Sequence, residues 1–255
     1  MISKLGAGTL SFARGIGAVA LVAARTVHRV PTLSGREFLR AWVRFGWDSL
    51  PLTLVVAVLT GITVVVQTTI FVQHFGVRAF VGWAGGYAVL WEFGPLLLGL
   101  MLAARSGARN AAELALLQVG GQIEGLRGVA LDPYALLVAP RVLALTLSVT
   151  SLAGVAFLVS ILFECATARW TLGLPLNVFF DNFAELLSAR DLLGGMTKAT
   201  VFGAAIALVS TTVGLAARGG ARAVGRAAAS AVVLSSASIF ALDLVLTTLF
   251  ARAFG

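Results

Sequence analysis

The stretch Ala84-Gly-Gly-Tyr-Ala-Val-Leu-Trp-Glu-Phe-Gly-Pro-Leu-Leu-Leu-Gly-Leu-Met-Leu-Ala-Ala104 decides the fold class of this chain. It is apolar except for Glu92, and it is long enough to cross a bilayer as a helix, which takes ~20 residues. A carboxylate near the bilayer centre costs at least ~2.5 kcal/mol, so such a residue usually faces a cavity or a partner. A polar segment, Arg105 to Arg141, follows directly. This combination predicts a transporter and not an inert membrane anchor.

The composition supports a membrane protein. Of 255 residues, 59% are hydrophobic and 12% are charged, whereas roughly 25% of the residues in a soluble domain are charged. The net charge of +8 does not indicate nucleic-acid binding, because the basic residues lie at the ends of apolar segments and not on one soluble face. A single cysteine, Cys165, excludes an internal disulfide, and we interpret it as a small apolar filler.

The hydropathy pattern predicts an all-α polytopic membrane protein with five spans. We place these spans at about Ser49 to Val72, Ala84 to Ala104, Leu136 to Phe163, Leu192 to Ala216 and Ala227 to Phe250. The more polar stretch from Ala166 to Asp191 should form a short interfacial helix and a loop.

The distribution of Lys and Arg predicts the orientation. The segments before the first span, after the second and after the fourth together hold 14 of the 19 basic residues. Basic residues accumulate on the cytoplasmic side, so the N-terminus should be cytoplasmic and the C-terminus on the outer side.

Residues 1–48 are expected to form interfacial helices, and residues 49–255 the transmembrane domain. The first thirty residues do not match a signal peptide, because they lack a compact apolar core with a cleavage site. On a helix, Lys4, Arg14, Arg25 and Arg29 share one face. This basic amphipathic helix should lie against anionic headgroups, or alternatively pack on a soluble partner. A second amphipathic piece, Gly35 to Asp48, leads into the first span.

The segment between the second and third spans predicts another amphipathic helix, at about residues 109–127. An apolar stripe at helical spacing is formed by Ala112, Leu116, Val119, Ile123 and Leu126. A short helix of this kind suits docking into a groove on another protein. A surface helix lying on the membrane fits the pattern equally well.

Motifs for catalysis are missing from the sequence. There is no G-x-x-x-x-G-K-[ST] phosphate loop and no G-x-S-x-G elbow. The two histidines, His28 and His74, begin no H-E-x-x-H pair, so no metal site is predicted. We therefore expect no enzymatic activity and no cofactor in this chain.

Several polar residues fall within the predicted spans. Glu92 faces a cavity or gate, or else makes a structural hydrogen bond between helices. Asp243, beside Thr247, is expected to bond between helices or within the chain, and Lys198 to snorkel to the outer interface. The hydroxyl groups of Thr68 and Thr69 line a pocket or bond to backbone carbonyls.

An ordered set of motifs resembles MlaE-type (YrbE-type) permeases over about Ser49 to Phe250. The motifs are Glu92-Phe-Gly-Pro95, Ala104-Arg105-Ser-Gly-Ala108, Ala111-Ala-Glu-Leu114, Gln122-Ile-Glu-Gly-Leu126, Asp132-Pro133, Pro140-Arg141, Asp191-Leu-Leu, Lys198-Ala-Thr-Val-Phe-Gly203, Gly219-Gly220, Val224-Gly-Arg226-Ala and Leu242-Asp243-Leu-Val-Leu-Thr247.

This resemblance implies the membrane subunit of an ATP-binding-cassette (ABC) lipid transporter in a bacterial inner membrane. A second permease copy (a homodimer rather than a heterodimer), a cytoplasmic ATPase pair that binds ATP and Mg²⁺, a periplasmic mammalian-cell-entry (MCE) protein and phospholipid would be its partners. The lipid pocket or gate would include Glu92, Gln67, Thr68, Phe71 and Asp243. The ATPase-coupling helix would use Glu113, Leu116, Val119, Gln122, Ile123, Glu124 and Leu126.

Two positions depart from the family pattern. Trp91 stands where the family commonly has an arginine, and Gly120-Gly121 begins the motif that commonly reads T-E-Q-I-D-A-L. The partner ATPase could have changed to match, or this chain could pair with a more typical sister subunit. Two other hypotheses remain open, an ion-coupled secondary carrier or channel and a non-transporting structural subunit.

Overall fold

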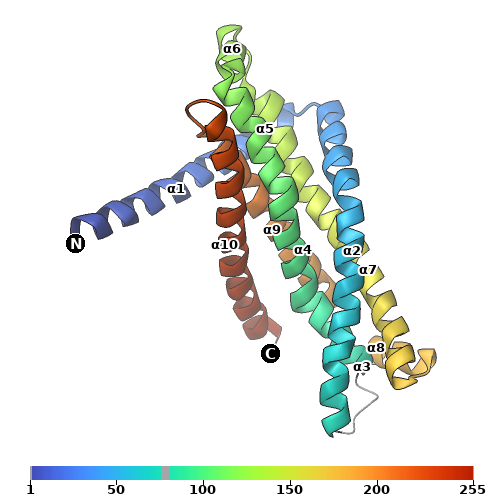
Figure 1. Cartoon of the computed structure of the whole chain (residues 1–255). Coiled ribbons are helices and arrows are strands. Elements are labelled where there is room, and N and C mark those ends of the chain that lie inside the picture. Colours follow the sequence, from blue (N-terminus) through green and yellow to red (C-terminus); the bar gives the residue numbers. More distant parts are fainter. Residues whose placement is uncertain (1, 76–80, 255) are drawn as a thin grey trace.

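The computed structural model describes residues 2–75 and 81–254, and every regular element in these ranges is a helix (Figure 1). The predicted all-α fold class is therefore confirmed. The helices are α1 (Ile2–Arg29), α2 (Gly35–Phe75), α3 (Val81–Ala88), α4 (Gly94–Leu102), α5 (Ala108–Val119), α6 (Gln122–Gly128), α7 (Ala139–Leu172), α8 (Leu176–Leu186), α9 (Ala189–Leu215) and α10 (Ala221–Phe254), with a 3-10 turn at Val30–Thr32.

Five helical segments among the described residues are long and apolar enough to span a membrane. They are Gly35–Ile70, Gly82–Val119, Tyr134–Leu172, Ala189–Leu215 and Ala221–Arg252. Each overlaps one of the predicted spans almost completely, and the first three extend well beyond the predicted limits at one end or both. The predicted amphipathic piece from Gly35 to Asp48 is not separate, because α2 runs through it into the first span.

The second span is one long helix with two wider turns in it. The π-helical segments Val89–Phe93 and Ala103–Gly107 lie on either side of α4. The helix then continues as α5, where polar side chains are buried against a neighbour. The Asn110 amide donates to Ser210 Oγ at 2.9 Å and to Thr211 Oγ1 at 3.0 Å, both on α9. The span ends at Val119, and the turn that follows contains Gly121, which has a φ of 70° that glycine adopts without strain.

Close helix contacts hold the bundle together. A Cβ atom at Gly61 on α2 would lie 2.3 Å from the backbone oxygen of Ser160 on α7, so the two helices touch through their backbones. Ser160 Oγ also donates to the carbonyl of Ala57 at 2.9 Å. Small residues permit this approach in membrane bundles, where packing and interhelical hydrogen bonds drive association.

The two ends of the bundle differ (Figure 1). One end, the α6 end, carries α6, the start of α2 and the connection between α9 and α10. The opposite end, the α8 end, carries α3 and α8. Helix α1 leaves the bundle sideways near the α6 end and projects away from it. Its Ile16 and Val27 side chains, on one face of the helix, are more than half exposed, so nothing in the described chain covers this apolar face.

Candidate functional site

Lys198 is the centre of a polar site inside the bundle. Its side chain is completely buried. The Nζ atom donates hydrogen bonds to four oxygens, which belong to the Trp91 backbone at 2.7 Å, Glu92 Oε2 at 3.1 Å, Asp243 Oδ1 at 2.9 Å and Thr247 Oγ1 at 2.7 Å. We call Glu92, Lys198, Asp243 and Thr247 the intramembrane cluster. It joins the second, fourth and fifth spans.

The cluster has one cation for two carboxylates. Thr247 links the acids further, because its hydroxyl donates to Glu92 Oε1 at 3.1 Å. Exposure is uneven, since the Glu92 side chain is 39% exposed and that of Asp243 15%. A buried ion pair is tolerated when its members satisfy each other's hydrogen bonds. The Lys198 ammonium group therefore has its hydrogen-bond partners within the protein, while the Glu92 carboxylate is accessible to a ligand, lipid or partner.

Local backbone features bring these residues together. Glu92 lies in the wide turn Val89–Phe93, a helix type that occurs often at functional sites. Gly195 lies nearly one turn before Lys198 on α9, and a Cβ atom there would come within 2.2 Å of the Leu90 carbonyl oxygen. The missing side chain lets α9 approach the second span closely enough for Lys198 to reach the Trp91 carbonyl.

The structure corrects the expectation for Lys198. We predicted that its side chain would snorkel to the outer interface, but it turns inward and is fully buried. The reason is that three polar side chains and a freed carbonyl offer it better partners than a long path to water. The two acids singled out from the sequence, Glu92 and Asp243, are brought together by this lysine.

Trp91 occupies the position of the family's arginine and makes a polar contact of its own. Its indole N–H donates to Asp191 Oδ1 at 2.8 Å. Its ring packs against Tyr87 at 5.7 Å and Phe250 at 5.6 Å between centroids. An aromatic donor thus links the second span to the first turn of α9, beside the intramembrane cluster.

The other predicted pocket residues do not join the cluster in the described structure. Thr68 Oγ1 donates to the carbonyl of Val64 at 2.8 Å, within its own helix. Gln67 is exposed on α2, and no contact with the cluster is found among the described residues. The side chain of Phe71 lies outside the described residues.

A second charged group lies near the α6 end. The carboxylate of Glu113 accepts hydrogen bonds from Arg44 at 2.5 Å, Arg109 at 3.0 Å and Arg141 at 3.0 Å, and Arg109 also pairs with Asp48. We call these five residues the α6-end cluster. It ties α5 to α2 and α7. Glu113, predicted to belong to the docking helix, is therefore directed into the bundle.

The predicted docking helix is divided in two. Residues 109–127 do not form one helix, because α5 ends at Val119 and α6 begins at Gln122 after the Gly120–Gly121 turn. The predicted stripe is also split: Leu116 is 63% exposed, whereas Ile123 is buried. Gln122 and Glu124 are exposed, Leu126 is half-buried, and Val119 packs against a small apolar group with Ala115 and Ala227.

Glu164 is a buried acid that the sequence analysis did not single out. Its side chain is fully buried in α7, and neither carboxylate oxygen has a hydrogen-bond partner among the described residues. It lies against Gly85, where a Cβ atom would be 3.3 Å from Glu164 Oε2. A single ionisable residue inside an apolar span is the signal that could have identified both Glu164 and Lys198.

Comparisons with known proteins find sequences similar to this chain. The profile of a family described as Permease MlaE matches residues 38–249. The chain is similar to the chloroplast protein TRIGALACTOSYLDIACYLGLYCEROL 1 of Arabidopsis thaliana, with 31% identity over 95% of this chain and 69% of the relative. It is also similar to a probable ABC transporter permease protein of Rickettsia conorii, with 29% identity over 97% of this chain and 96% of the relative. A probable ABC transporter permease protein of Synechocystis is 26% identical over 82% of this chain and 79% of the relative.

Proposed function

Because the chain belongs to the MlaE permease family and is a membrane-spanning ABC permease subunit, we propose that it moves phospholipid or a similar amphiphile. In this proposal, ATP is bound with Mg²⁺ and hydrolysed by a separate cytoplasmic subunit, and the lipid is exchanged with a periplasmic MCE protein. The Arabidopsis relative is named after a glycolipid, which supports an amphiphile as the substrate class.

The intramembrane cluster is the observation that carries this proposal. A lipid headgroup needs polar partners inside the bilayer, and Glu92 offers a carboxylate that is 39% exposed. Such a group can accept hydrogen bonds from a headgroup amine or hydroxyl. Lys198 and Thr247 hold the same carboxylate in place from the protein side. The site can therefore recognise a headgroup without leaving an isolated charge in the membrane.

We propose that a second copy of the chain completes the lipid pocket next to α10. In the most apolar window of this helix only 17% of the residues are buried, against 39–50% in the other four spans. Exposed apolar side chains such as Leu244 and Val245 flank the position of Asp243. A second copy packed on this face would enclose the lipid between the two clusters.

The ATPase contact is proposed for the α6 end, which would then be cytoplasmic. A groove of about 1000 Å³ lies between the α5–α6 turn and the connection from α9 to α10, lined by Gln118, Val119, Gly121, Glu124, Arg127 and residues 215–220. Leu116 is exposed close to it. An ATPase bound in this groove would contact the end of α9, because Leu215 lines the groove. Its movement could then be passed along α9, the helix that carries Lys198.

The test is lipid transfer by the full complex in proteoliposomes. The chain is reconstituted with its ATPase and MCE partners, and the ATP-dependent transfer of a fluorescent phospholipid is measured. Glu92→Gln should lower the transfer rate about tenfold, because it removes a charged hydrogen-bond acceptor. Glu185→Gln, at an exposed acid on α8, is the matched control and should transfer at the unmodified rate.

Two outcomes would contradict the proposal. Transport by the purified chain alone, driven by an ion gradient, would favour an ion-coupled carrier in which Glu92 and Asp243 bind the ion. Undiminished transfer by Glu92→Gln, with assembly intact, would leave the cluster a structural role only.

A further inference from the structure

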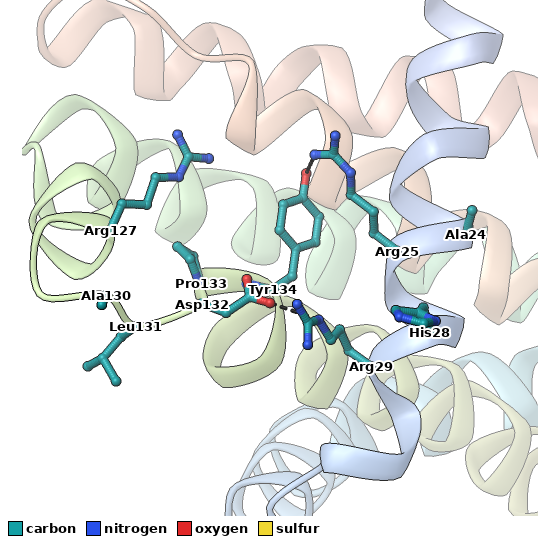
Figure 2. Close-up of a pocket in the computed structure, with 10 residues that line it drawn as sticks. All are labelled: Ala24, Arg25, His28, Arg29, Arg127, Ala130, Leu131, Asp132, Pro133 and Tyr134. Atoms are coloured by element: carbon teal, nitrogen blue, oxygen red, sulfur yellow. Dashed lines mark hydrogen bonds and ion pairs between the residues drawn. The ribbon is translucent and has the colours of Figure 1, made fainter.

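A cavity at the junction of α1 with the bundle lies apart from the intramembrane cluster. It has a volume of about 780 Å³. One wall is the last part of α1, and the other follows α6 through the turn to Tyr134 (Figure 2). The lining residues are Ala24, Arg25, His28, Arg29, Arg127, Ala130, Leu131, Asp132, Pro133 and Tyr134.

The cavity has more positive than negative charge. It contains three arginines and one acid, and Arg29 pairs with that acid, Asp132, at 2.8 Å. Arg25 contacts only a neutral group in the described structure, the phenol of Tyr134: Nη1 donates to its hydroxyl at 3.3 Å and the guanidinium lies 5.2 Å from the ring centroid. Arg127 makes no side-chain hydrogen bond or ion pair among the described residues.

The arrangement positions one of the two uncompensated guanidinium groups, that of Arg25, for an anion. Tyr134 fixes Arg25 through its ring and hydroxyl, while the backbone N–H of Tyr134 donates to Asp132 Oδ1 at 2.9 Å. In Figure 2, the guanidinium groups of Arg25 and Arg127 lie on the same side of the cavity as the Tyr134 hydroxyl. Arginine forms paired hydrogen bonds with phosphate oxygens, and groups that are already positioned lose less entropy on binding.

The position of α1 indicates how deep in the membrane this cavity lies. Ile16 and Val27 are exposed on the side of α1 opposite to the arginines. An amphipathic helix with an uncovered apolar face lies in the interface, with its basic face at the level of the headgroups. The cavity beside Arg25 is therefore at the depth of lipid phosphates.

We propose that this cavity binds an anionic phosphate group through Arg25 and Arg127, most directly the headgroup of an anionic lipid in the leaflet that α1 contacts. Bound there, the lipid bridges α1 and the α6 turn and fixes the angle at which α1 leaves the bundle. This site shares no residue with the intramembrane cluster, and one residue, Arg127, with the groove proposed for the ATPase; lipid binding by the chain without its ATPase therefore tests it separately from the proposed function.

The test measures lipid binding by the full-length chain in a neutral detergent, using native mass spectrometry. The probes are phosphatidylglycerol, phosphatidylcholine with the same acyl chains, and inorganic phosphate. We expect phosphatidylglycerol to bind more tightly than phosphatidylcholine. The double variant Arg25→Gln/Arg127→Gln should bind phosphatidylglycerol at least about tenfold more weakly, because two charged hydrogen-bond donors are lost. Arg222→Gln, at an exposed arginine outside the cavity, removes one charge, as Arg127→Gln does; it is the control for net charge in that comparison and should bind normally.

The other measurements distinguish a lipid headgroup from free inorganic phosphate as the ligand. If inorganic phosphate binds alone with the same dependence on Arg25 and Arg127 and displaces the lipid, the free ion is the ligand. If it does neither, the ligand is the lipid. Should the double variant not fold, Arg127→Gln alone gives the same test, because this side chain makes no described hydrogen bond or ion pair. Equal binding of phosphatidylglycerol by the cavity variants and by Arg222→Gln overturns the proposal, as does equal binding of the two lipids.

Discussion

The intramembrane cluster and the α6-end cluster are opposite in design. In the first, a single cation, Lys198, serves two carboxylates and is completely buried. In the second, the central residue is a carboxylate, Glu113, which accepts from three arginines whose side chains are 19–48% exposed, and one of these arginines also pairs with Asp48. Both join three segments of the bundle. They differ in how much water reaches the residue at the centre.

This difference determines what the loss of the central residue costs. Two acids left without their cation inside an apolar bundle cannot be solvated well, so the folded state carries an uncompensated buried charge. Three arginines left without their acid can turn toward water, because they are long, flexible and already partly exposed. The intramembrane cluster should therefore be sensitive to the loss of any member, and the α6-end cluster tolerant.

The largest expected effect is that of Lys198→Met. Removal of one partner of a buried ion pair destabilises a protein by about 3–5 kcal/mol, so the unfolding midpoint in detergent should fall strongly. The measurement is SDS-induced unfolding followed by tryptophan fluorescence.

A matched triple variant sharpens this prediction. Lys198→Met combined with Glu92→Gln and Asp243→Asn removes all three charges while keeping the side-chain sizes similar. It should recover most of the lost stability, since no buried charge remains unpaired. A triple variant as unstable as Lys198→Met would show that packing, and not charge, holds these spans together.

A smaller effect is expected for Glu113→Gln. The loss should be about 1–2 kcal/mol, because the arginines it pairs with are partly screened by water, and it should shrink when salt is added. The control is Glu124→Gln on α6, an exposed acid with no described contact, which should leave the unfolding midpoint unchanged. A loss as large as that of Lys198→Met, independent of salt, would remove the distinction between the two clusters.

The smallest effect is expected for Trp91→Phe. The phenyl ring keeps the aromatic contacts with Tyr87 and Phe250 but loses the hydrogen bond to Asp191, worth about 1 kcal/mol. A double-mutant cycle with Asp191→Ala, which removes the acceptor, measures this coupling without the contribution of the Asp191 helix cap. A coupling energy of zero would mean that Trp91 acts only through packing.

Local properties of the sequence were sufficient to predict the number and the approximate centres of the spans. Each span needs only enough consecutive apolar residues, and this can be counted along the chain. Glu92 was identified by the same reasoning, because an acid in such a run is conspicuous. The limits of the spans were missed where polar or charged residues are satisfied within the bundle, as with Asn110 and Glu113 in α5.

The partner of Glu92 could not be predicted in this way. Lys198 is 106 positions away in sequence, and its proximity to one end of a span suggested an ordinary path to water. Only the packing of α9 on the second span, made possible at Gly195, directs the lysine inward. Hydropathy counts every charge as facing solvent, so it cannot distinguish a lysine that snorkels from one that holds three helices together.

The two wide turns of the second span have a consequence for how its length can vary. A π-turn is an α-helix with one additional residue, and each residue of an α-helix advances the chain by about 100° around the axis. The π-turn Val89–Phe93 takes up its additional residue in nearly the same rotation about the axis as the α-helical turn that it replaces. Deleting one residue there would restore regular winding and leave α3 and α4 near their present orientations. The same deletion within α4 would instead rotate the flanking segments by about 100°, so the wide turn is where the second span can lose a residue without changing which faces its two halves present.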